Sequence, residues 1–280
     1  MNAPVSITVA PNGARRGKAD HAAIPLTPAE IAAEARACRE AGAAILHLHV
    51  RDAQGRHSLD PGLYREAIAA VRAVCDLVIQ PTTERVGVFA PADMMRVGRE
   101  LAPEMMSLNL TELLGDGGAS DTASARDFLA ELAAGGTVPQ YIVYDHAELA
   151  MLRDWHARGW LPQRTPFVLL VLGRYGDRVS RPADVVGYLP ELPDGWPWGL
   201  CAFGPPELAC NVQAALAGGH CRVGFENNLV SAGGQPLADN AEQVARLAGV
   251  LGTLGFALAS PQDVRRAFGL RSLQGAGSCC

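Results

Sequence analysis

Eight short apolar runs alternate with amphipathic segments along this chain of 280 residues. The amphipathic segments carry helix-start signals; Thr27-Pro28, for example, precedes Glu30 with the spacing of a capping box. Alternation of this kind, with no linker-like stretch between the units, predicts parallel strands joined by helices. At this length a closed (β/α)8 TIM barrel fits better than an open doubly wound sheet. We expect a single barrel domain over residues 1–270 and a disordered tail over residues 271–280.

The predicted strands indicate where polar groups should gather. They cover residues 5–10, 44–50, 77–82, 105–110, 138–144, 167–172, 198–203 and 220–225. A Gly-rich stretch at 115–120 is expected to be a loop, and it lacks the glycine spacing of a phosphate-binding motif. Since the active site of a TIM barrel lies at the carboxyl ends of its strands, polar residues at these ends are the candidate site residues.

Composition excludes several kinds of chemistry. The net charge is −5, with 24 Lys+Arg against 29 Asp+Glu, which argues against a nucleic-acid partner. Lys18 is the only lysine, so no later strand end can supply a lysine for a Schiff base. The seven cysteines contain no C-x-x-C pair. No apolar run has membrane-spanning length and no charged segment precedes the apolar N-terminus, so we expect a cytoplasmic protein without a membrane partner.

Two histidines end the second predicted strand. Residues 45–52 read I-L-H-L-H-V-R-D, so the side chains of His47 and His49 would leave one face of the strand. Two neutral imidazoles held in this way can bind one divalent metal ion. The pattern leaves open a second interpretation, in which both are packed, hydrogen-bonded histidines. His57 lies in a polar stretch and is expected to be solvated.

A carboxylate after the eighth strand completes this candidate site. In a closed barrel the eighth strand lies beside the first and the first beside the second, so Glu226 comes within reach of the two histidines. Two histidines and one carboxylate leave an open position on a metal ion, which is typical of catalytic sites. Arg222, Gly224 and Glu226 are expected to share one strand face, where Arg222 suits a carboxylate substrate. A structural ion pair with a core carboxylate remains the alternative for Arg222.

Several motifs resemble those of the β-keto acid cleavage enzyme family, the relatives of 3-keto-5-aminohexanoate cleavage enzyme. In chain order they are H-L-H-V-R-D, Q-P-T-T, P-E-M-M-S-L-N, G-G-H-C-R-V-G-F-E-N-N and N-A-E-Q-V-A-R. The resemblance runs from Ile7 to Leu270. It implies a catalytic TIM barrel, usually a homotetramer, in which His47, His49 and Glu226 hold a divalent metal ion, typically Zn²⁺.

The resemblance also implies a reaction and roles for further residues. Enzymes of this family condense a β-keto acid with acetyl-CoA and cleave the adduct to acetoacetate and a new acyl-CoA. Arg222 matches the family's active-site arginine, and Thr82 matches a position that holds Ser or Thr. Ser107 and Asn109 would line the floor of the pocket. The remaining candidates for substrate binding, all placed after predicted strands, are Thr83, Glu84 and Asp145.

Three departures from the family pattern concern acid/base chemistry. Asn227 stands where the family usually has an aspartate that transfers a proton, and an amide cannot take a proton at neutral pH. Arg15 stands at the position of a first-loop glutamate, and Glu84-Arg85 replaces a Gly-Gly pair. We therefore expect a divergent member, in which Glu84 or Asp145 could supply the carboxylate.

Two other classes of function stay open at this point. Amidohydrolase-like metal hydrolases also place an H-x-H pair in a barrel, but on the first strand and with further histidines, of which only His146 has a counterpart here. A metal- or ligand-binding barrel with weakened catalysis is the other alternative, and the Asn227 substitution favours it.

Overall fold

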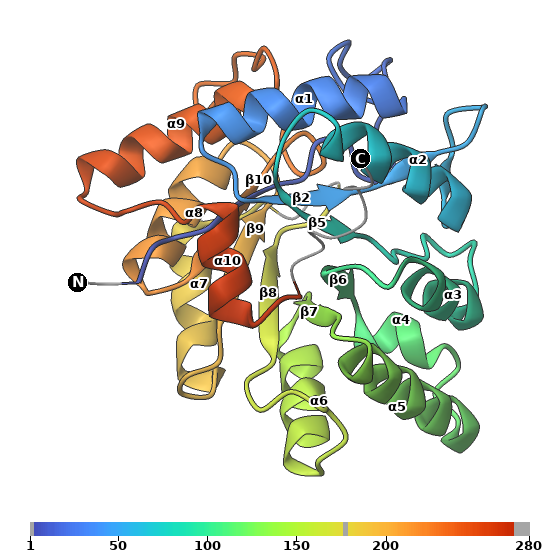
Figure 1. Ribbon diagram of the computed structural model, residues 1–280. Coiled ribbons are helices and arrows are strands. Elements are labelled where there is room, and N and C mark those ends of the chain that lie inside the picture. Colours follow the sequence, from blue (N-terminus) through green and yellow to red (C-terminus); the bar gives the residue numbers. More distant parts are fainter. Residues whose placement is uncertain (1–2, 176–178, 272–280) are drawn as a thin grey trace.

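The computed structural model describes residues 3–175 and 179–271. Figure 1 shows its strands gathered at the centre with the helices around them. The elements follow in the order β1 (Ile7–Val9), α1 (Pro28–Ala41), β2 (Ile45–Leu48), β3 (Val50–Arg51), β4 (His57–Ser58), α2 (Pro61–Arg72), β5 (Val78–Pro81), α3 (Pro91–Leu101), β6 (Met105–Leu108), α4 (Leu110–Leu114), α5 (Ala119–Ala134), β7 (Val138–Val143), α6 (His146–Ala157), β8 (Phe167–Leu172), α7 (Pro182–Tyr188), the 3-10 turn η1 (Leu189–Glu191), β9 (Trp198–Ala202), α8 (Glu207–Leu216), β10 (His220–Val223), α9 (Asn240–Thr253) and α10 (Pro261–Phe268).

Eight parallel strands form a nearly closed barrel, which confirms the predicted (β/α)8 fold. Their order is β5-β2-β1-β10-β9-β8-β7-β6, so β10 lies one strand away from β2, as the position of Glu226 requires. The two end strands, β5 and β6, lie side by side, yet no backbone ladder joins them within the described residues. A side chain bridges this gap, because the hydroxyl of Thr83 donates to the carbonyl oxygen of Ser107 at 3.0 Å.

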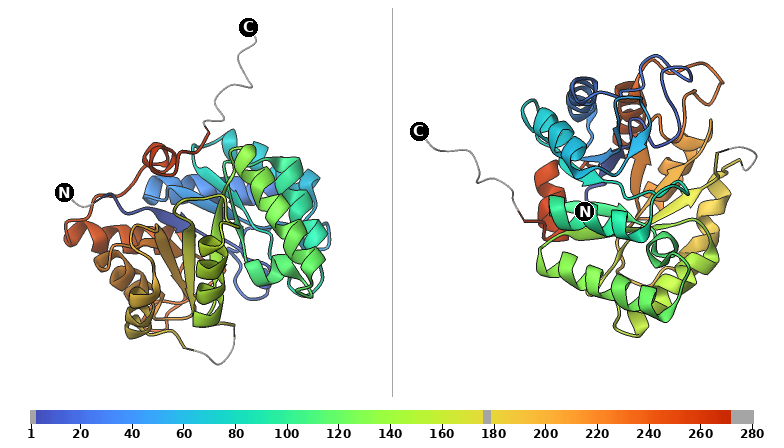
Figure 2. Two further views of the ribbon diagram at one scale, coloured as in Figure 1. Left: turned by 90° about the horizontal axis from the view of Figure 1, so that it is seen from below. Right: turned by 90° about the vertical axis from the view of Figure 1, so that its right-hand side faces the viewer.

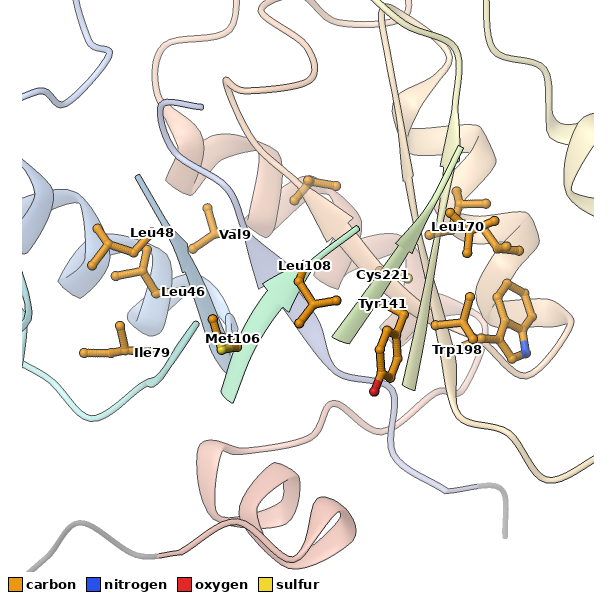
Figure 3. Close-up of a cluster of buried hydrophobic side chains, with 14 of the residues drawn as sticks. Val9, Leu46, Leu48, Ile79, Met106, Leu108, Tyr141, Leu170, Trp198 and Cys221 are labelled. Atoms are coloured by element: carbon orange, nitrogen blue, oxygen red, sulfur yellow. The ribbon is translucent and has the colours of Figure 1, made fainter. Parts of the chain in front are cut away.

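Strand residues alternate between two apolar regions. Leu46, Leu48 and Ile79 belong to the main core between strands and helices, part of which Figure 3 shows. Val78, one residue before Ile79, packs instead in a smaller cluster with Val264 of α10. Figure 2 shows α10, in red, against one end of the barrel. α10 therefore covers the amino ends of the strands.

Two of the strands that end earlier than predicted are followed by candidate metal ligands. β2 ends at Leu48, which leaves His49 in the single-residue break before β3. β10 ends at Val223, because Gly224 has φ 143° and begins a turn in which the N–H of Asn227 donates to its carbonyl oxygen at 2.8 Å. The expectation that strand alternation places Glu226 on the face of Arg222 was wrong. The turn brings Glu226 there instead.

The helix α4 and the β3–β4 hairpin were not predicted. Asn109 ends β6 earlier than expected and caps α4, since its Oδ1 accepts from the N–H of Glu112 at 2.9 Å. α5 then starts at Ala119, inside the expected Gly-rich loop. Strands β3 and β4 pair antiparallel after the second barrel strand and bring Arg51 opposite His57. His57 is therefore partly buried, and the expectation that it is solvated was wrong.

Every helix in the described part of the chain is too short or too polar to span a membrane. Of the predicted C-terminal tail only Arg271 is described, and its guanidinium donates to the carbonyl oxygen of Ala102 at 2.8 Å. Residues 272–280 lie outside the described residues.

Replacing Gly224 by alanine should destabilise the fold, because a Cβ there would lie 2.2 Å from the carbonyl oxygen of Ala10 at a φ of +143°. We expect a loss of about 2 kcal/mol or more in the free energy of unfolding, measured by urea titration. The control is Gly249→Ala in α9, where a Cβ meets open space. That change should be neutral or stabilise by up to about 1 kcal/mol. Equal stability of the two variants would contradict the close approach of these backbones.

Candidate active site

Three potential metal-ligand atoms converge at the carboxyl ends of the strands. The Nε2 atoms of His47 and His49 lie 3.1 Å apart. Oε2 of Glu226 lies 3.5 Å from the first and 3.2 Å from the second. All three side chains are buried, with exposed fractions of 1%, 0% and 8%. Two imidazole nitrogens and a carboxylate oxygen, grouped in this way, can hold one divalent ion.

The hydrogen bonds of His47 indicate which of its nitrogens is free. Nδ1 of His47 lies 2.9 Å from Oε1 of Gln80, while Nε2 of Gln80 donates to Gln140 at 3.1 Å. Since the Gln80 amide nitrogen is already used, its oxygen accepts from Nδ1–H, and Nε2 of His47 keeps its lone pair. Burial, reinforced by Arg222, holds the pKa of His47 well below its usual range. The imidazole is therefore neutral, as a metal ligand must be.

A neighbouring arginine keeps Glu226 ionised. Burial alone would raise the pKa of Glu226, but Arg222 and His49 outweigh it and hold that pKa well below its ordinary value. The guanidinium of Arg222 donates to Oε1 of Glu226 in a short contact, which leaves Oε2 toward the imidazoles. Both partners are buried, so each neutralises a charge that would otherwise be costly inside the barrel.

The loop after β1 fixes the side chain of Glu226. A Cβ on Gly13 would lie 2.4 Å from Cγ of Glu226, so only glycine permits this approach. Arg51, from the H-L-H-V-R-D motif, holds the loop in place through its guanidinium. It donates to the carbonyl oxygens of Ala14 at 2.7 Å and Arg16 at 2.9 Å, and also to that of Gly13. Arg51 of the motif therefore holds the loop after β1 in place beside the site.

A small pocket of about 20 Å³ adjoins the converging atoms. It mixes charged groups with an aromatic and aliphatic wall. The lining residues are His47, Thr82, Glu84, Glu112, Ile142, Tyr144, Val171, Cys201, Phe203, Arg222, Glu226 and Asn227. This volume holds about one water molecule.

Asn227 faces the pocket with unused hydrogen-bonding groups. Its side chain is buried, and neither its Oδ1 nor its Nδ2 has a hydrogen-bond partner among the described residues. An unpaired buried amide costs about 1–3 kcal/mol, and such groups in native proteins call for an explanation. A ligand in the pocket would supply the missing partners.

Two carboxyl groups line the same pocket. Burial raises the pKa of Glu84 above its ordinary value, although His49 acts in the opposite direction. Burial also raises the pKa of Glu112 to about 7. Arg15, from the loop after β1, lies 3.7 Å from Glu84. Carboxyl groups whose pKa is raised by burial in a pocket are candidates for general acid/base work.

Of the hydroxyl residues predicted for the site, one lines the pocket and two lie behind or beside it. Thr82 lines the pocket, and its Oγ1 accepts from the N–H of Glu84 at 3.1 Å. Thr83 turns away to join β5 to β6. Ser107 is fully buried, with Oγ 3.5 Å from Nδ1 of His47. Ser107 thus lies behind a ligand rather than in the pocket lining.

The other two predicted residues lie outside this pocket. Asn109 caps α4, and its Nδ2 donates to Glu148 at 3.0 Å. Asp145 caps α6, where its Oδ1 accepts from the N–H of Glu148 at 2.9 Å. Both polar side chains are therefore engaged in helix starts. His146, the residue that an amidohydrolase-like site would use, lies 2.7 Å from Glu191 and stacks on Tyr188, away from the pocket.

Sequence reasoning missed several lining residues. Tyr144 and Phe203 end predicted strands and Cys201 lies two residues before such an end, so the barrel rule could have marked them, although their types suggested packing. Glu112 had no such signal, because it lies on α4, which was not predicted.

The turn that carries Glu226 rests on another buried carboxyl group. Glu207, at the start of α8, accepts from the N–H of Gly224 at 3.2 Å, from Asn228 at 3.3 Å and from Gln243 at 2.9 Å. Burial raises the pKa of Glu207 to about 8. These contacts hold Gly224 and Asn228, which lie on either side of Glu226 in the turn.

The chain as a whole matches one family of enzymes. Residues 4–270 match the family described as beta-keto acid cleavage enzyme. The chain belongs to that family. The resemblance seen in the motifs is thereby confirmed, and the family's activity, cleavage of β-keto acids, gives the site its chemical context.

Curated relatives agree with this membership. The chain is 32% identical over 273 residues to 3-keto-5-aminohexanoate cleavage enzyme from Fusobacterium nucleatum, which covers 95% of this chain and 97% of that protein. It is 28% identical over 291 residues to 3-dehydrocarnitine:acetyl-CoA trimethylamine transferase from Rhizobium meliloti, covering 95% and 96%.

A solved structure shares the fold. The apo structure of ObcA matches with a TM-score of 0.70 and 20% identity, over 88% of this chain and 65% of the ObcA chain. A ternary complex of ObcA with a C4-CoA adduct and oxalate matches with a TM-score of 0.69 and 21% identity, over 88% and 67%. This chain thus spans about two thirds of ObcA, and at these identities the likeness concerns the fold.

Glu207→Gln should change how stability depends on pH. The pKa of Glu207 rises from 4.5 to about 8 on folding, so the folded protein holds this proton more tightly than the unfolded chain does. Wild-type stability should therefore fall as the pH rises from about 4.5 to about 8, and the glutamine variant lacks this loss. We expect the difference in Tm, variant minus wild type, to increase by several degrees as the pH rises from about 4.5 to about 8, measured by calorimetry. A Tm difference that is constant with pH would contradict the shift.

Proposed function

We propose that this protein is a metal-dependent β-keto acid cleavage enzyme that converts a β-keto acid and acetyl-CoA to acetoacetate and a new acyl-CoA. The observation that carries the proposal is the convergence of His47, His49 and Glu226 beside Arg222 in a chain of this family. Acetyl-CoA is named as co-substrate in relatives at 28% and 27% identity. Their names support the same co-substrate here.

The residues fit a divalent ion, for which Zn²⁺ is our first choice because two imidazoles and one carboxylate suit it. When bound, such an ion would act as a Lewis acid toward the oxygen atoms of the keto acid. Arg222 would pair with the substrate carboxylate through the donors that Glu226 leaves free. Asn227 and Thr82 would donate further hydrogen bonds, and Asn227 has its full capacity available.

We assign the proton transfer to Glu84. Burial is the largest cause that raises the pKa of both carboxyl groups. The charges of His49, Glu226 and Arg222 also act on the pKa of Glu84, whereas Arg85, Glu84 and Glu148 act on that of Glu112. These charges support Glu84 as the carboxyl group that acts beside the ligand atoms. As a base it would take a proton from C2 of the keto acid, so that the electron pair on C2 attacks the acetyl carbonyl and the CoA thiolate leaves.

The same proton completes the reaction. The thiolate attacks the original keto carbon, the bond from that carbon to C2 breaks, and the electron pair stays on C2. Glu84 returns its proton to C2, which yields acetoacetate and the new acyl-CoA. Asp145 is not assigned this role, because its carboxylate caps α6.

We further propose that the protein is a cytoplasmic homotetramer, as the family resemblance implies.

A metal- or ligand-binding barrel with weakened catalysis is the second candidate. The observation that favours it is Asn227, which cannot take a proton. The two candidates differ in one measurement, the release of acyl-CoA when a panel of β-keto acids is supplied with acetyl-CoA. Hydrolysis without CoA would instead favour an amidohydrolase-like reaction.

Removing an imidazole should remove both metal and turnover. His47→Ala or His49→Ala should lower the metal content per chain, measured by elemental analysis, and reduce kcat/KM by about 100-fold or more. His146→Ala removes an exposed histidine from α6 and should leave metal content and turnover unchanged. Full metal content in the His47 and His49 variants would contradict the assigned ligand set.

Removing the proposed acid/base group should lower kcat selectively. Glu84→Gln should reduce kcat by about 100-fold or more, since proton transfer contributes about 10²–10⁴. Glu112→Gln makes the same chemical change in the same pocket and should have a smaller effect. Adding Asn227→Asp to the Glu84→Gln variant should restore part of the rate. If Glu84→Gln turns over like wild type while Asn227→Asp alone is faster, the assignment to Glu84 is wrong.

A further inference from the structure

A third histidine lies beside the candidate metal ligands and has no part in the proposed reaction. His57 lies on β4, where it pairs with Arg51 of β3 in the short hairpin that follows β2. The centroid of its ring is 5.2 Å from that of His49 and 5.7 Å from that of Phe89. The hairpin thus folds an imidazole from outside the barrel sheet against one of the candidate ligands.

The hydrogen bond of His57 determines which of its nitrogens carries the hydrogen. Nε2 lies 2.9 Å from the carbonyl oxygen of Glu84, which can only accept, so Nε2–H is the donor. Burial lowers the pKa of His57 to about 3, so the ring is neutral at neutral pH and Nδ1 keeps its lone pair. Nδ1 is buried and has no hydrogen-bond partner in the described part of the chain. His57 therefore offers an unused acceptor.

His49 has the opposite requirement. Its Nε2 lies 3.2 Å from Oε2 of Glu226 and belongs to the candidate ligand set, so a neutral ring that binds an ion there carries its hydrogen on Nδ1. Histidine ligands usually donate this hydrogen to a protein or water oxygen, which fixes the ring and makes it a better ligand. His47 donates to Gln80, whereas Nδ1 of His49 is buried without a partner among residues 3–175 and 179–271. His49 therefore has an unused donor.

A third unpartnered atom belongs to the same hairpin. Arg51 uses its terminal nitrogens on the loop after β1, while its Nε is buried and has no partner among the described residues. Its charge acts on the pKa of His57, as expected for a neighbour across the hairpin. Two donors, on His49 and Arg51, and one acceptor, on His57, thus lie unused on neighbouring residues. A buried water molecule typically makes about three hydrogen bonds, so a single one would satisfy all three atoms.

We propose that His57 is a positioning residue for His49, which it orients through one bridging water molecule. The water accepts from Nδ1–H of His49 and from Nε–H of Arg51, and it donates to Nδ1 of His57. The carbonyl oxygen of Glu84 holds the other side of the His57 ring, so this chain of contacts joins a candidate metal ligand to the backbone of the proposed acid/base residue. The inference rests on the ligand set of the proposed function.

The affinity of the full-length protein for Zn²⁺, measured by competition with a chromogenic chelator, tests this role. His57→Phe keeps an aromatic ring against Phe89 but removes the acceptor, and it should weaken Zn²⁺ binding by about 10–100-fold. His57→Asn loses the ring but keeps an oxygen near the position of Nδ1, so it should retain most of the affinity. The matched control is His156→Phe, which should leave the affinity unchanged. Nε2 of His156 also lies 2.9 Å from a backbone carbonyl oxygen, and its ring also meets an aromatic ring edge-on, but it lies on α6.

The order of the two variants separates a hydrogen-bonding role from a packing role. If His57 only fills space, His57→Phe should bind Zn²⁺ at least as tightly as His57→Asn, and that order would overturn the inference. If His57→Phe fails to fold, His57→Leu, which also lacks an acceptor, takes its place.

The outcomes also separate this role from the reaction. Unchanged Zn²⁺ affinity in His57→Phe, together with cleavage of a β-keto acid by wild type, overturns the positioning role and leaves the proposed function standing. Weakened binding in His57→Phe without any cleavage by wild type supports the positioning role and overturns the reaction. A wild-type protein that binds no Zn²⁺ would overturn the ligand set and this inference with it.

Discussion

The buried ion pair between Arg222 and Glu226 is the interaction on which the candidate site depends. A carboxylate inside a barrel needs a compensating charge, and Arg222 supplies it from the last strand while leaving one oxygen for the two imidazoles. This pairing requires Glu226 to reach back over the strand end. The turn at Gly224 makes that possible, and the close approach of Gly13 then holds the side chain. Backbone shape at two glycines thus determines where the carboxylate points.

The charged groups around this centre differ from those that the resemblance in the motifs leads one to expect. An amide occupies position 227, while a carboxyl group at position 84 enters the same pocket and lies beside an arginine at position 15. The substitutions, far apart in the chain, thus meet in space. This proximity agrees with the proposal that Glu84 supplies the carboxyl group for proton transfer.

Much of the barrel could be predicted because its signals are local. Strand alternation, the capping box at Thr27 and the prolines that open helices are properties of a few neighbouring residues, and each was found in the structure. The departures have local causes that a pattern does not reveal. Asn109 ends β6 because it caps α4, and His57 becomes partly buried because a two-residue hairpin folds it onto His49. Asp145, polar and well placed in sequence, caps α6 and so lies outside the pocket.

The sequence by itself determined the barrel, the histidine pair and the candidate third ligand, because strand order in a closed barrel follows chain order. Only the tertiary structure decided how these groups meet. Glu226 arrives by a turn rather than by strand alternation, and Arg51 clamps the first loop instead of facing the pocket. Glu84 and Glu112 share the pocket through loop and helix geometry that no local pattern encodes. Side-chain direction at loop positions depends on packing between distant segments, and the amino-acid pattern alone does not contain it.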